Sequence, residues 1–413
     1  MPIPLSSPRP LSPILPGRGT LGVLKDMAQE VATSSAALEG GIAIETARGL
    51  GDRLRLLNSY YSNLIEGHKT TLPEIERALA RDFAEAPDRR YAQELCAAHV
   101  MVERELMDEL QSHPYLHVCT AEYIKGIHRR IYGHLPDAHQ YTHHSGGFTD
   151  IAVSPGELRD RDVSVDGRTP HGPPASELPN LMEAFAEAFA PHVFHGDERL
   201  IAAAVSHHRL TWLHPFRDGN GRLARLHTGI YLVRGKVNQA NLWSLARGFS
   251  RNKIGYMINL QATDSPGRPD NDHFFDEPLS ADFCRFFFEI CLDQIGFMRG
   301  LLKLDDVEHR IEWLVASLKK STMPSLAPEA SRLLRAVFRQ GAVIRGKAPE
   351  IVGKSERTTR RTVIAPLIES GLLVSASHRA PLCMGFPMAA LPYLFPGLFD
   401  PTVVGEEYRE LIV

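Results

Sequence analysis

One stretch near the middle of the chain constrains the fold more than any other: His214 to Arg225, which reads HPFRDGNGRLAR. Residues 198–213 before it carry apolar side chains at helical spacing, and the same spacing resumes after Gly221. Pro215 ends the first helix because proline has no N–H to donate and restricts the residue before it. We therefore predict two helices joined by a tight turn.

The turn has the composition of an anion-binding loop. Residues 218–221 (Asp-Gly-Asn-Gly) tolerate positive φ, so their N–H groups can converge on one point. That point lies at the N-terminus of the second helix, where unpaired N–H groups and the helix dipole favour phosphate. Arg222 and Arg225 are three residues apart on its first turn and can point the same way. Two guanidinium groups beside such a loop are suited to bind a polyphosphate.

An Asn-Gly turn, a histidine at a helix end or a surface arginine is by itself usually structural. In this order, however, the residues resemble the signature His-Pro-Phe-x-Asp-Gly-Asn-Gly-Arg-x-x-Arg of the Fic family at every defined position. The resemblance implies a mostly helical fold. It also implies transfer of AMP from ATP to a Ser, Thr or Tyr hydroxyl of a protein.

The resemblance assigns a role to each position. His214 matches the general base, a role that suits imidazole because its ordinary pKa is near neutral. Phe216 is expected to be buried and to hold the loop, and Asp218 to bind Mg²⁺, a hard cation that prefers oxygen ligands. The remaining positions imply ATP binding. Gly219, Asn220 and Gly221 are expected to bind phosphates through their backbone N–H groups, with the Asn220 amide as a further donor. Arg222 and Arg225 are expected to bind the outer phosphates.

A second motif closes a helix predicted for residues 41–66, since Gly67 is a natural stop signal. Glu66 lies on the last turn, where the helix dipole disfavours a carboxylate, so we expect a cationic partner. Ser62-x-x-x-Glu66-Gly67 resembles the inhibitory motif of Fic proteins. That resemblance implies an ion pair between Glu66 and Arg225 and low basal activity. An alternative role is activation of water by Glu66 to remove AMP from a modified target.

Length and composition limit the number of domains, the kinds of partner and the cellular compartment that we expect. A chain of 413 residues is too long for one core and indicates two or three domains. A net charge of −3 gives no overall attraction to nucleic acid or membranes. Five scattered cysteines indicate reduced thiols and a cytoplasmic protein. No apolar run approaches the roughly 20 residues that span a bilayer, so we expect no membrane partner.

Two segments between the motifs invite interpretation. Histidines 134, 139, 143 and 144 lie in a Pro/Gly-rich loop without the spacing of a complete zinc site. Residues 156–168 contain alternating Val163 and Val165 and an Asp-Gly turn, which predicts a short β-ribbon. It resembles the Fic flap, which implies that Val163, Ser164 and Val165 hold a target segment by strand addition.

The segment after the signature resembles the part of Fic proteins that closes the nucleotide pocket. The resemblance implies that Tyr256 lies against the adenine of ATP and that Asp264 lies nearby; ordinary packing of Tyr256 in a helix is the alternative. Many Fic proteins carry paired aromatic residues where this chain has Tyr256-Met257. Met257 is thus a departure from the pattern, and it leaves the selectivity for the base open.

The C-terminal part resembles a winged helix. Residues 328–340, 347–352 and 356–370 predict three helices, the last kinked at Pro366, and a strand begins at Gly371. Residues 325–379 carry ten Lys/Arg against four Glu, and Arg357, Arg360 and Arg361 cluster on the presumed recognition helix. DNA binding and protein docking or homodimer formation are both open interpretations.

We thus predict a mostly α protein: a Fic-type helical core with a small β-hairpin flap, plus a C-terminal winged-helix-like α+β domain. The predicted divisions are a Pro-rich flexible tail (1–20), a helical region with the inhibitory helix (21–120), the catalytic core (121–320), the winged-helix-like domain (325–395) and a tail (396–413). The predicted function is an autoinhibited, Mg²⁺- and ATP-dependent protein adenylyltransferase that also modifies itself. The alternatives are a Fic enzyme with another nucleotide donor and a nucleotide-sensing DNA-binding regulator.

Overall fold

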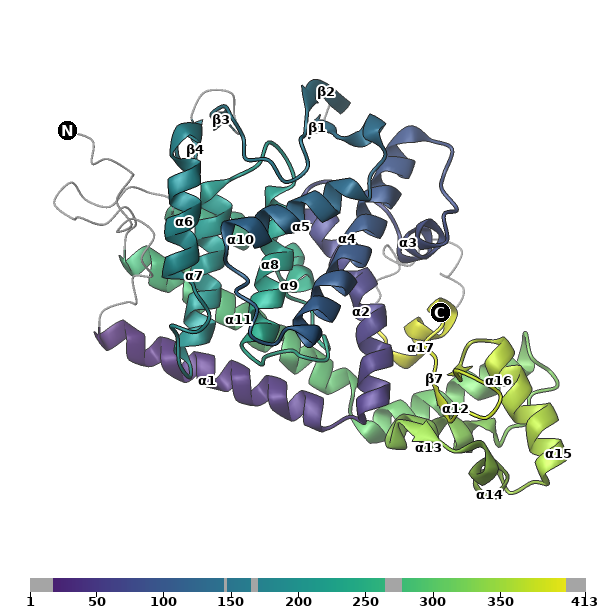
Figure 1. The fold of residues 1–413 in the computed structure, drawn as a ribbon. Helices are drawn as coiled ribbons and strands as arrows, with labels where there is room; N and C mark the ends of the chain where they lie inside the picture. Colours follow the sequence, from purple (N-terminus) through teal and green to yellow (C-terminus); the bar gives the residue numbers. More distant parts are fainter. Residues whose placement is uncertain (1–17, 145–146, 165–169, 264–276, 399–413) are drawn as a thin grey trace.

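The computed structural model describes residues 18–144, 147–164, 170–263 and 277–398, and it is mostly helical, as predicted (Figure 1). The helices of the N-terminal and central parts are α1 (Arg18–Gly40), α2 (Ile44–Ile65), α3 (Leu72–Leu79), α4 (Pro87–Ser112), α5 (Ala121–Gly133), α6 (Leu178–Ala188), α7 (Glu198–Leu213), α8 (Asn220–Arg234), α9 (Leu245–Arg251), α10 (Lys253–Thr263) and α11 (Glu277–Leu301).

The first helix runs along one side of this bundle. α1 packs against α11 and α7 through Leu24, Ala28, Val31 and Leu38, which recur at helical spacing and are buried. The predicted tail extended to residue 20, but α1 already begins at Arg18, and residues 1–17 lie outside the described ranges. The apolar face of α1 begins at Leu21, so the helix starts close to the first residue it can bury.

Helices α2, α7 and α8 position the site. α7 and α8 pack against each other, and α2 packs on α4, α9 and α8. The predicted helices 41–66 and 198–213 correspond to α2 and α7. The C-terminal end of α2 faces the start of α8, where Arg225 Nη2 donates to the Ser62 carbonyl.

Two small hairpins cover one end of the bundle. Strands β1 (Tyr141–His144) and β2 (Gly147–Ala152) pair antiparallel, so the loop predicted around the histidines is wrong for residues 141–144. Residues 147–152 contain Phe, Thr and Ile, which favour strands, and the partner that stabilises this strand is the preceding segment. Strands β3 (Val163–Ser164) and β4 (Pro170–His171) form the predicted ribbon, while Val165 lies outside the described residues.

The C-terminal domain lies beside the bundle (Figure 1). It comprises α12 (Leu304–Lys320), α13 (Ala330–Gln340), β5 (Ala342–Val343), α14 (Ala348–Val352), α15 (Glu356–Thr359), α16 (Ala365–Glu369), β6 (Leu373–Val374), β7 (Leu382–Met384) and α17 (Leu391–Leu394). The strands form an antiparallel sheet in the order β5-β7-β6. α12 packs on α13 and α17, so it belongs to this domain and does not complete the core as predicted. Ion pairs that cross the α12–α13 contact reinforce this packing.

The last long helix of this domain accommodates its proline without ending. α15 and α16 are joined by a π-helical segment, Arg360–Ile364, directly before Pro366. A proline removes the hydrogen bond to the carbonyl four residues earlier, here that of Thr362. That carbonyl accepts a hydrogen bond from the Ala327 N–H at 3.0 Å instead. The prediction of a helix disturbed near Pro366 is confirmed, and the disturbance is a widened turn.

Within the described ranges, no helix combines the length and the apolar composition that crossing a membrane requires.

Candidate functional site

The loop between α7 and α8 begins with a strained histidine. α7 ends at Leu213, and His214 has a left-handed conformation (φ 44°, ψ 57°), which is uncommon for a residue with a side chain. Arg159, which is 2% exposed, holds this conformation. Its Nε donates to the His214 carbonyl at 2.8 Å, and its backbone N–H donates to the Pro215 carbonyl at 2.9 Å. His214 is thus placed by a residue of the segment that precedes the β3–β4 ribbon.

The loop is closed on itself by Asn220. The Phe216 N–H donates to Asn220 Oδ1 at 2.9 Å, and Asn220 Nδ2 donates to the Phe216 carbonyl at 2.7 Å. The Asn220 amide is used inside the loop in this conformation, and its expected role as a phosphate donor stays a prediction. Its backbone N–H at the first position of α8 remains suited to an anion.

A second buried residue supports the loop from α5. The His128 ring stacks on the ring of Phe216, with 3.9 Å between centroids, and Phe216 is fully buried as predicted. The Gly156 N–H donates to His128 Nδ1 at 2.9 Å, so Nε2 carries the proton that it shares with the Asp218 carbonyl at 3.2 Å. Burial lowers the pKa of His128 to about 3, which keeps the ring neutral in this arrangement.

The carboxylate of Asp218 is only partly used by the protein. Its Oδ1 accepts from the Gly219 N–H at 2.5 Å and from Arg222 at 3.3 Å. Its buried Oδ2 has no hydrogen-bond partner among the described residues. Gly219 has φ 78°, and a Cβ there would lie 3.0 Å from the Tyr132 ring, so glycine is required at this position. An unused carboxylate oxygen in an anion-binding loop fits a hard divalent cation.

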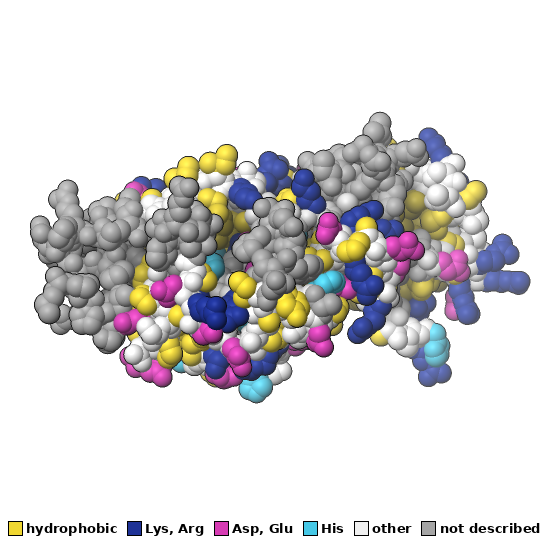
Figure 2. Space-filling view, turned by 90° about the horizontal axis from the view of Figure 1, so that it is seen from above, with side chains coloured by type: hydrophobic (Ala, Val, Ile, Leu, Met, Phe, Trp, Pro, Cys, Tyr) yellow, Lys and Arg dark blue, Asp and Glu magenta, His cyan; other side chains and the backbone are white. Residues whose placement is uncertain are grey.

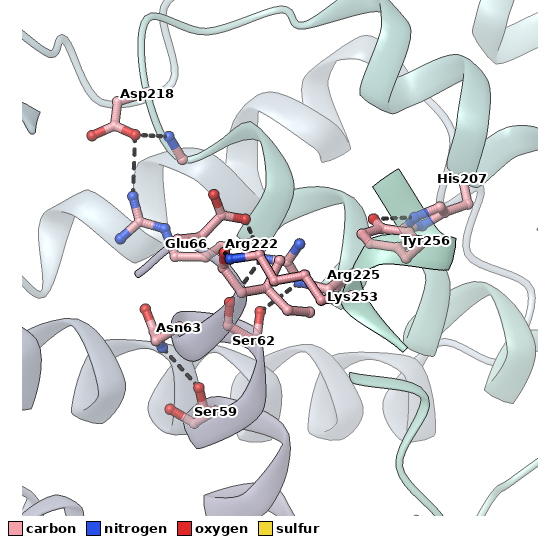
Figure 3. Close-up of polar contacts among 12 residues, drawn as sticks. Ser59, Ser62, Asn63, Glu66, His207, Asp218, Arg222, Arg225, Lys253 and Tyr256 are labelled. Atoms are coloured by element: carbon pink, nitrogen blue, oxygen red, sulfur yellow. Dashed lines mark hydrogen bonds and ion pairs between the residues drawn. The ribbon is translucent and has the colours of Figure 1, made fainter. Parts of the chain in front are cut away.

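Two arginines of α8 have different hydrogen-bond partners. Arg222 is 2% exposed and lies beside Asp218 and the hydroxyl of Tyr132. Arg225 points to the end of α2, where its Nε donates to Ser62 Oγ at 2.8 Å and its Nη2 donates to the Ser62 carbonyl at 2.9 Å (Figure 3). Both guanidinium groups are therefore held in place before any ligand binds.

The predicted ion pair between α2 and α8 is present. Arg225 Nη2 lies 2.5 Å from Glu66 Oε1, and the exposed fractions of the two side chains are 4% and 35% (Figure 3). Burial raises the pKa of Glu66, but the charge and hydrogen bond of Arg225, together with the charges of Arg222 and His68, outweigh it, so this pKa lies below its usual value. Glu66 is therefore ionised at neutral pH and occupies the guanidinium expected to hold an outer phosphate.

The backbone at the end of α2 is fully engaged around Glu66. Gly67 (φ 92°) donates to the Leu64 carbonyl at 3.1 Å, and the His68 N–H donates to the Asn63 carbonyl at 3.0 Å, which is a Schellman motif. Lys253 Nζ donates to the Ile65 carbonyl at 2.6 Å. Together with Arg225 on Ser62, these donors satisfy the last four carbonyls of the helix and place two cations at its negative end.

Gly221 makes room for Glu66. It has an ordinary helical conformation, so the positive φ that its type allows is not used here. A Cβ at Gly221 would lie 2.2 Å from Glu66 Oε1 and 3.1 Å from Arg225 Nη1. The glycine is therefore needed for the approach of the α2 carboxylate to α8.

The placement of Tyr256 against an adenine stays a prediction, and its side chain is buried. Its side chain is 2% exposed, its ring stacks on Phe249 with 4.3 Å between centroids, and its hydroxyl lies 2.8 Å from His207 Nε2. Tyr256 thus belongs to the core and offers no face to an adenine in this conformation. Met257, by contrast, is 44% exposed. Asp264 lies outside the described residues.

Sequence reasoning missed three residues that shape the site: Arg159, His128 and Lys253. Each acts through a contact with a residue that is far away in the chain. Their local patterns are those of a charged ribbon residue, an apolar helix face and a surface lysine, so the sequence carried no signal for them. The alternating charges near Arg159 even favoured solvent exposure.

The fold and the site define a helical protein with a phosphate-binding loop at a helix N-terminus and a carboxylate set against its second arginine. Residues 118–232 match the Fic/DOC family model. This part of the chain is therefore similar in sequence to the Fic/DOC family.

Curated relatives match less than half of the chain. The chain is 33% identical over 184 residues to "Protein adenylyltransferase Fic" of Nematostella vectensis, which covers 42% of this chain and 36% of that protein. It is 29% identical over 180 residues to the protein of the same name from Aedes aegypti, covering 42% and 31%. The chain thus matches about a third of the length of these relatives.

Solved structures share the fold. A Fic family protein from Desulfovibrio desulfuricans G20 superposes with a TM-score of 0.50 at 16% identity, covering 87% of this chain and 96% of that one. A Fic domain containing signaling protein from Bacteroides thetaiotaomicron has a TM-score of 0.50 at 20% identity, covering 66% and 95%. At such identities the likeness establishes the fold.

Proposed function

We propose that this protein is a Mg²⁺-dependent protein adenylyltransferase that transfers AMP from ATP to a hydroxyl side chain of a protein. One observation carries the proposal: a histidine held at the start of an anion-binding loop, followed on the same helix start by two buried, preoriented arginines. The names of the relatives support the choice of AMP as the transferred group. Ser, Thr and Tyr hydroxyls are all compatible with a histidine base, and transfer to the protein's own hydroxyls belongs to the same proposal.

In the proposed reaction, His214 accepts the proton of the target hydroxyl as its oxygen bonds to the α-phosphorus of ATP. The bond from that phosphorus to the bridging oxygen breaks, and pyrophosphate leaves. The N–H groups of Gly219, Asn220 and Gly221 hold the phosphates, and Arg222 and Arg225 hold the outer ones. Catalysis in this scheme comes from positioning and fixed charge.

Asp218 would hold the metal ion through Oδ2, its unused oxygen. Mg²⁺ bound there would neutralise charge on the phosphates. Its partners on Oδ1, the Gly219 N–H and Arg222, fix the orientation of the carboxylate, so this side chain would need little rearrangement to receive the ion.

Glu66 is proposed to inhibit the enzyme by occupying Arg225. An outer phosphate and the Glu66 carboxylate compete for the same Nη2 donor, and Ser62 keeps the guanidinium in place in either case. The chain would then bind ATP with its outer phosphates misplaced and show low basal activity. Activation of water by Glu66 for removal of AMP is the alternative use of the same carboxylate.

The ribbon of β3 and β4 is proposed to hold the target. Val163 and Ser164 pair with His171 and Pro170 on one side only, which leaves a strand edge for an extended segment of the target. The residues just before the ribbon are tied to the His214 carbonyl through Arg159, so the strand edge and the base belong to one connected unit.

The test is incubation of the full chain with labelled ATP, Mg²⁺ and a lysate, followed by mass spectrometry of modified proteins. We expect an AMP-sized mass addition that His214→Ala abolishes. Retained transfer by His214→Ala would remove this residue from the mechanism. His134→Ala is a matched control, because His134 lies on the surface and pairs with Glu105.

Another nucleotide donor is a second candidate, favoured by the burial of Tyr256. The proposed contacts of the loop are all with phosphates, and the one aromatic residue expected at the base is in the core. Competition between labelled ATP, UTP and a phosphocholine nucleotide would identify the donor. Transfer from UTP in preference to ATP would replace AMP in the proposal.

A further inference from the structure

We propose that the C-terminal domain binds double-stranded nucleic acid through the outer face of its α15–α16 helix. The order of elements, α13, β5, α14, α15–α16, β6 and β7, is that of the winged-helix interpretation. α14 and α15 are joined by residues 353–355, where Gly353 has φ 74° and Ser355 caps the next helix. Such a turn places the second helix on the surface of the domain.

The second helix has a basic outer face. Thr359, Val363, Ile364 and Leu367 are buried, whereas Arg357, Arg360 and Arg361 are exposed. Spacings of three and four residues put the arginines on one side of the helix, where they line one surface groove with Glu356 and Ala365. Within the described ranges, none of the three arginines forms an ion pair, so their charges are available to phosphates.

The neighbouring wing is ordered and also basic. Residues 375–381 connect β6 to β7 and contain exposed His378 and Arg379. Ser375 Oγ and Arg345 Nε both donate to the Ala380 carbonyl, at 3.0 and 3.2 Å, which fixes the connection. Figure 2 shows Lys and Arg side chains projecting from this end of the molecule.

Duplex nucleic acid fits this surface better than an acidic protein does. The helix from residue 356 to 369 is about 21 Å long and presents arginines only on its outer side, a shape that enters a groove about 12 Å wide. A fixed wing beside such a helix reaches a second part of the phosphate backbone. Because the chain as a whole has a net charge of −3, we expect attraction to nucleic acid only at this basic surface.

The test is fluorescence anisotropy of a labelled DNA duplex with the full chain at rising salt. A duplex of any sequence can serve as the probe, because binding without sequence preference has a measurable Kd of about 10⁻⁴ to 10⁻⁶ M at physiological salt. We expect the variant with Arg357, Arg360 and Arg361 all changed to Gln to bind at least about tenfold more weakly. Its salt slope should be smaller by about 2.7 if each arginine meets one phosphate.

A matched control changes Arg335 and Arg339 to Gln. These arginines lie in the same domain but pair with Glu312 and Glu308, so binding should change little. Unfolding midpoints verify that all variants fold. Three outcomes overturn the proposal: no binding to any duplex in 50 mM salt, wild-type binding by the triple variant, or equal competition by polyglutamate.

Independently, the geometry points to α2 as a mechanical link between the C-terminal domain and Glu66; this inference rests on the proposed autoinhibition. The N-terminal half of α2 contacts α13 and β7. Thr46 Oγ1 donates to the Phe338 carbonyl at 2.9 Å in a buried contact, and Gly49 lies directly against the Phe386 ring. The other end of the same helix, about 33 Å long, carries Ser62 and Glu66.

A continuous helix transmits a displacement at one end to the other because its backbone hydrogen bonds keep it rigid. A Cβ at Gly49 would lie 3.3 Å from the Phe386 ring and 3.4 Å from the Met384 carbonyl. Gly49→Leu therefore wedges the domain away from α2 without touching the nucleotide loop. We expect basal AMP transfer to rise at least about fivefold, with no further rise when Glu66→Gly is also present.

Gly22→Leu on α1 is the matched control. No atom lies within 4 Å of a Cβ built at Gly22, so this variant should leave AMP transfer unchanged. Thr46→Val, which removes only the buried hydrogen bond, is the milder variant if Gly49→Leu does not fold. An active Glu66→Gly protein combined with wild-type transfer by both α2 variants would overturn the link. Inactivity of Glu66→Gly itself would instead count against the proposed inhibition.

Discussion

Replacing Glu66 tests the proposed inhibition most directly. Glu66→Gly removes the carboxylate 2.5 Å from Arg225 and leaves the two hydrogen bonds from Arg225 to Ser62 in place. A hydrogen bond to a charged group contributes about 1.5 to 3 kcal/mol when it is well buried. If displacement of Glu66 costs that much in the wild type, the variant should transfer AMP about 10- to 160-fold faster, since each 1.36 kcal/mol is a factor of ten.

The assay is the initial rate of AMP incorporation from labelled ATP at saturating Mg²⁺. Glu66→Gln should give a smaller rise, because the amide keeps a neutral hydrogen bond of about half the strength. Glu76→Gln is the matched control: Glu76 also pairs with an arginine of α2, Arg53 at 2.7 Å, but away from the loop. The double variant Glu66→Gly/His214→Ala should be inactive.

Two results would refute this reasoning. Equal rates for the wild type and Glu66→Gly, in protein shown to fold, would mean that the ion pair does not limit phosphate binding. A comparable rise in Glu76→Gln would mean that loosening α2 anywhere activates the protein, and the specific competition for Arg225 would then be wrong.

Two further changes test the packing around the site. Gly221→Ala places a methyl group 2.2 Å from Glu66 Oε1 and should raise basal transfer by about tenfold, the lower end of the range above. Gly229→Ala on the same helix has free space and should leave basal transfer unchanged. If the effects of Gly221→Ala and Glu66→Gly were additive, displacement of Glu66 would not explain the rise. Burial raises the pKa of Glu103 to about 7. The folded state therefore binds more protons than the unfolded state between about pH 4.5 and 7. As the pH rises through that window, the free energy of unfolding falls by about 3 kcal/mol. Glu103→Gln should remove this fall, as measured by urea unfolding at pH 5 and 8; parallel pH profiles would show that the carboxyl is not the cause.

The signature loop was predictable because its structure is largely local. Pro215 ends a helix, Gly219 adopts positive φ, and an amphipathic helix starts at Asn220, all within a few residues. The same holds for the end of α2, where Gly67 supplies the left-handed residue of a Schellman motif. The three C-terminal helices were predictable for the same reason, since apolar periodicity depends only on the helix itself.

The tertiary structure corrected interpretations that depended on distant neighbours. Tyr256 has the pattern of a half-exposed helix residue, but Phe249 and His207 from other elements enclose it. α12 follows α11 in sequence, yet its apolar face matches α13 and α17. The β1–β2 hairpin depends on pairing across a turn, which a loop-like composition conceals.

The sequence alone determined which residues are proposed to carry the chemistry, because the proposed base, the anion-binding loop and the paired arginines must follow one another closely to share one helix start. Only the tertiary structure decided which distant residues contact them. The approach of Glu66 to Arg225, the grip of Arg159 on His214 and the contact of α2 with the C-terminal domain join residues far apart in the chain. Such contacts arise from the packing of whole helices, and no local pattern encodes them.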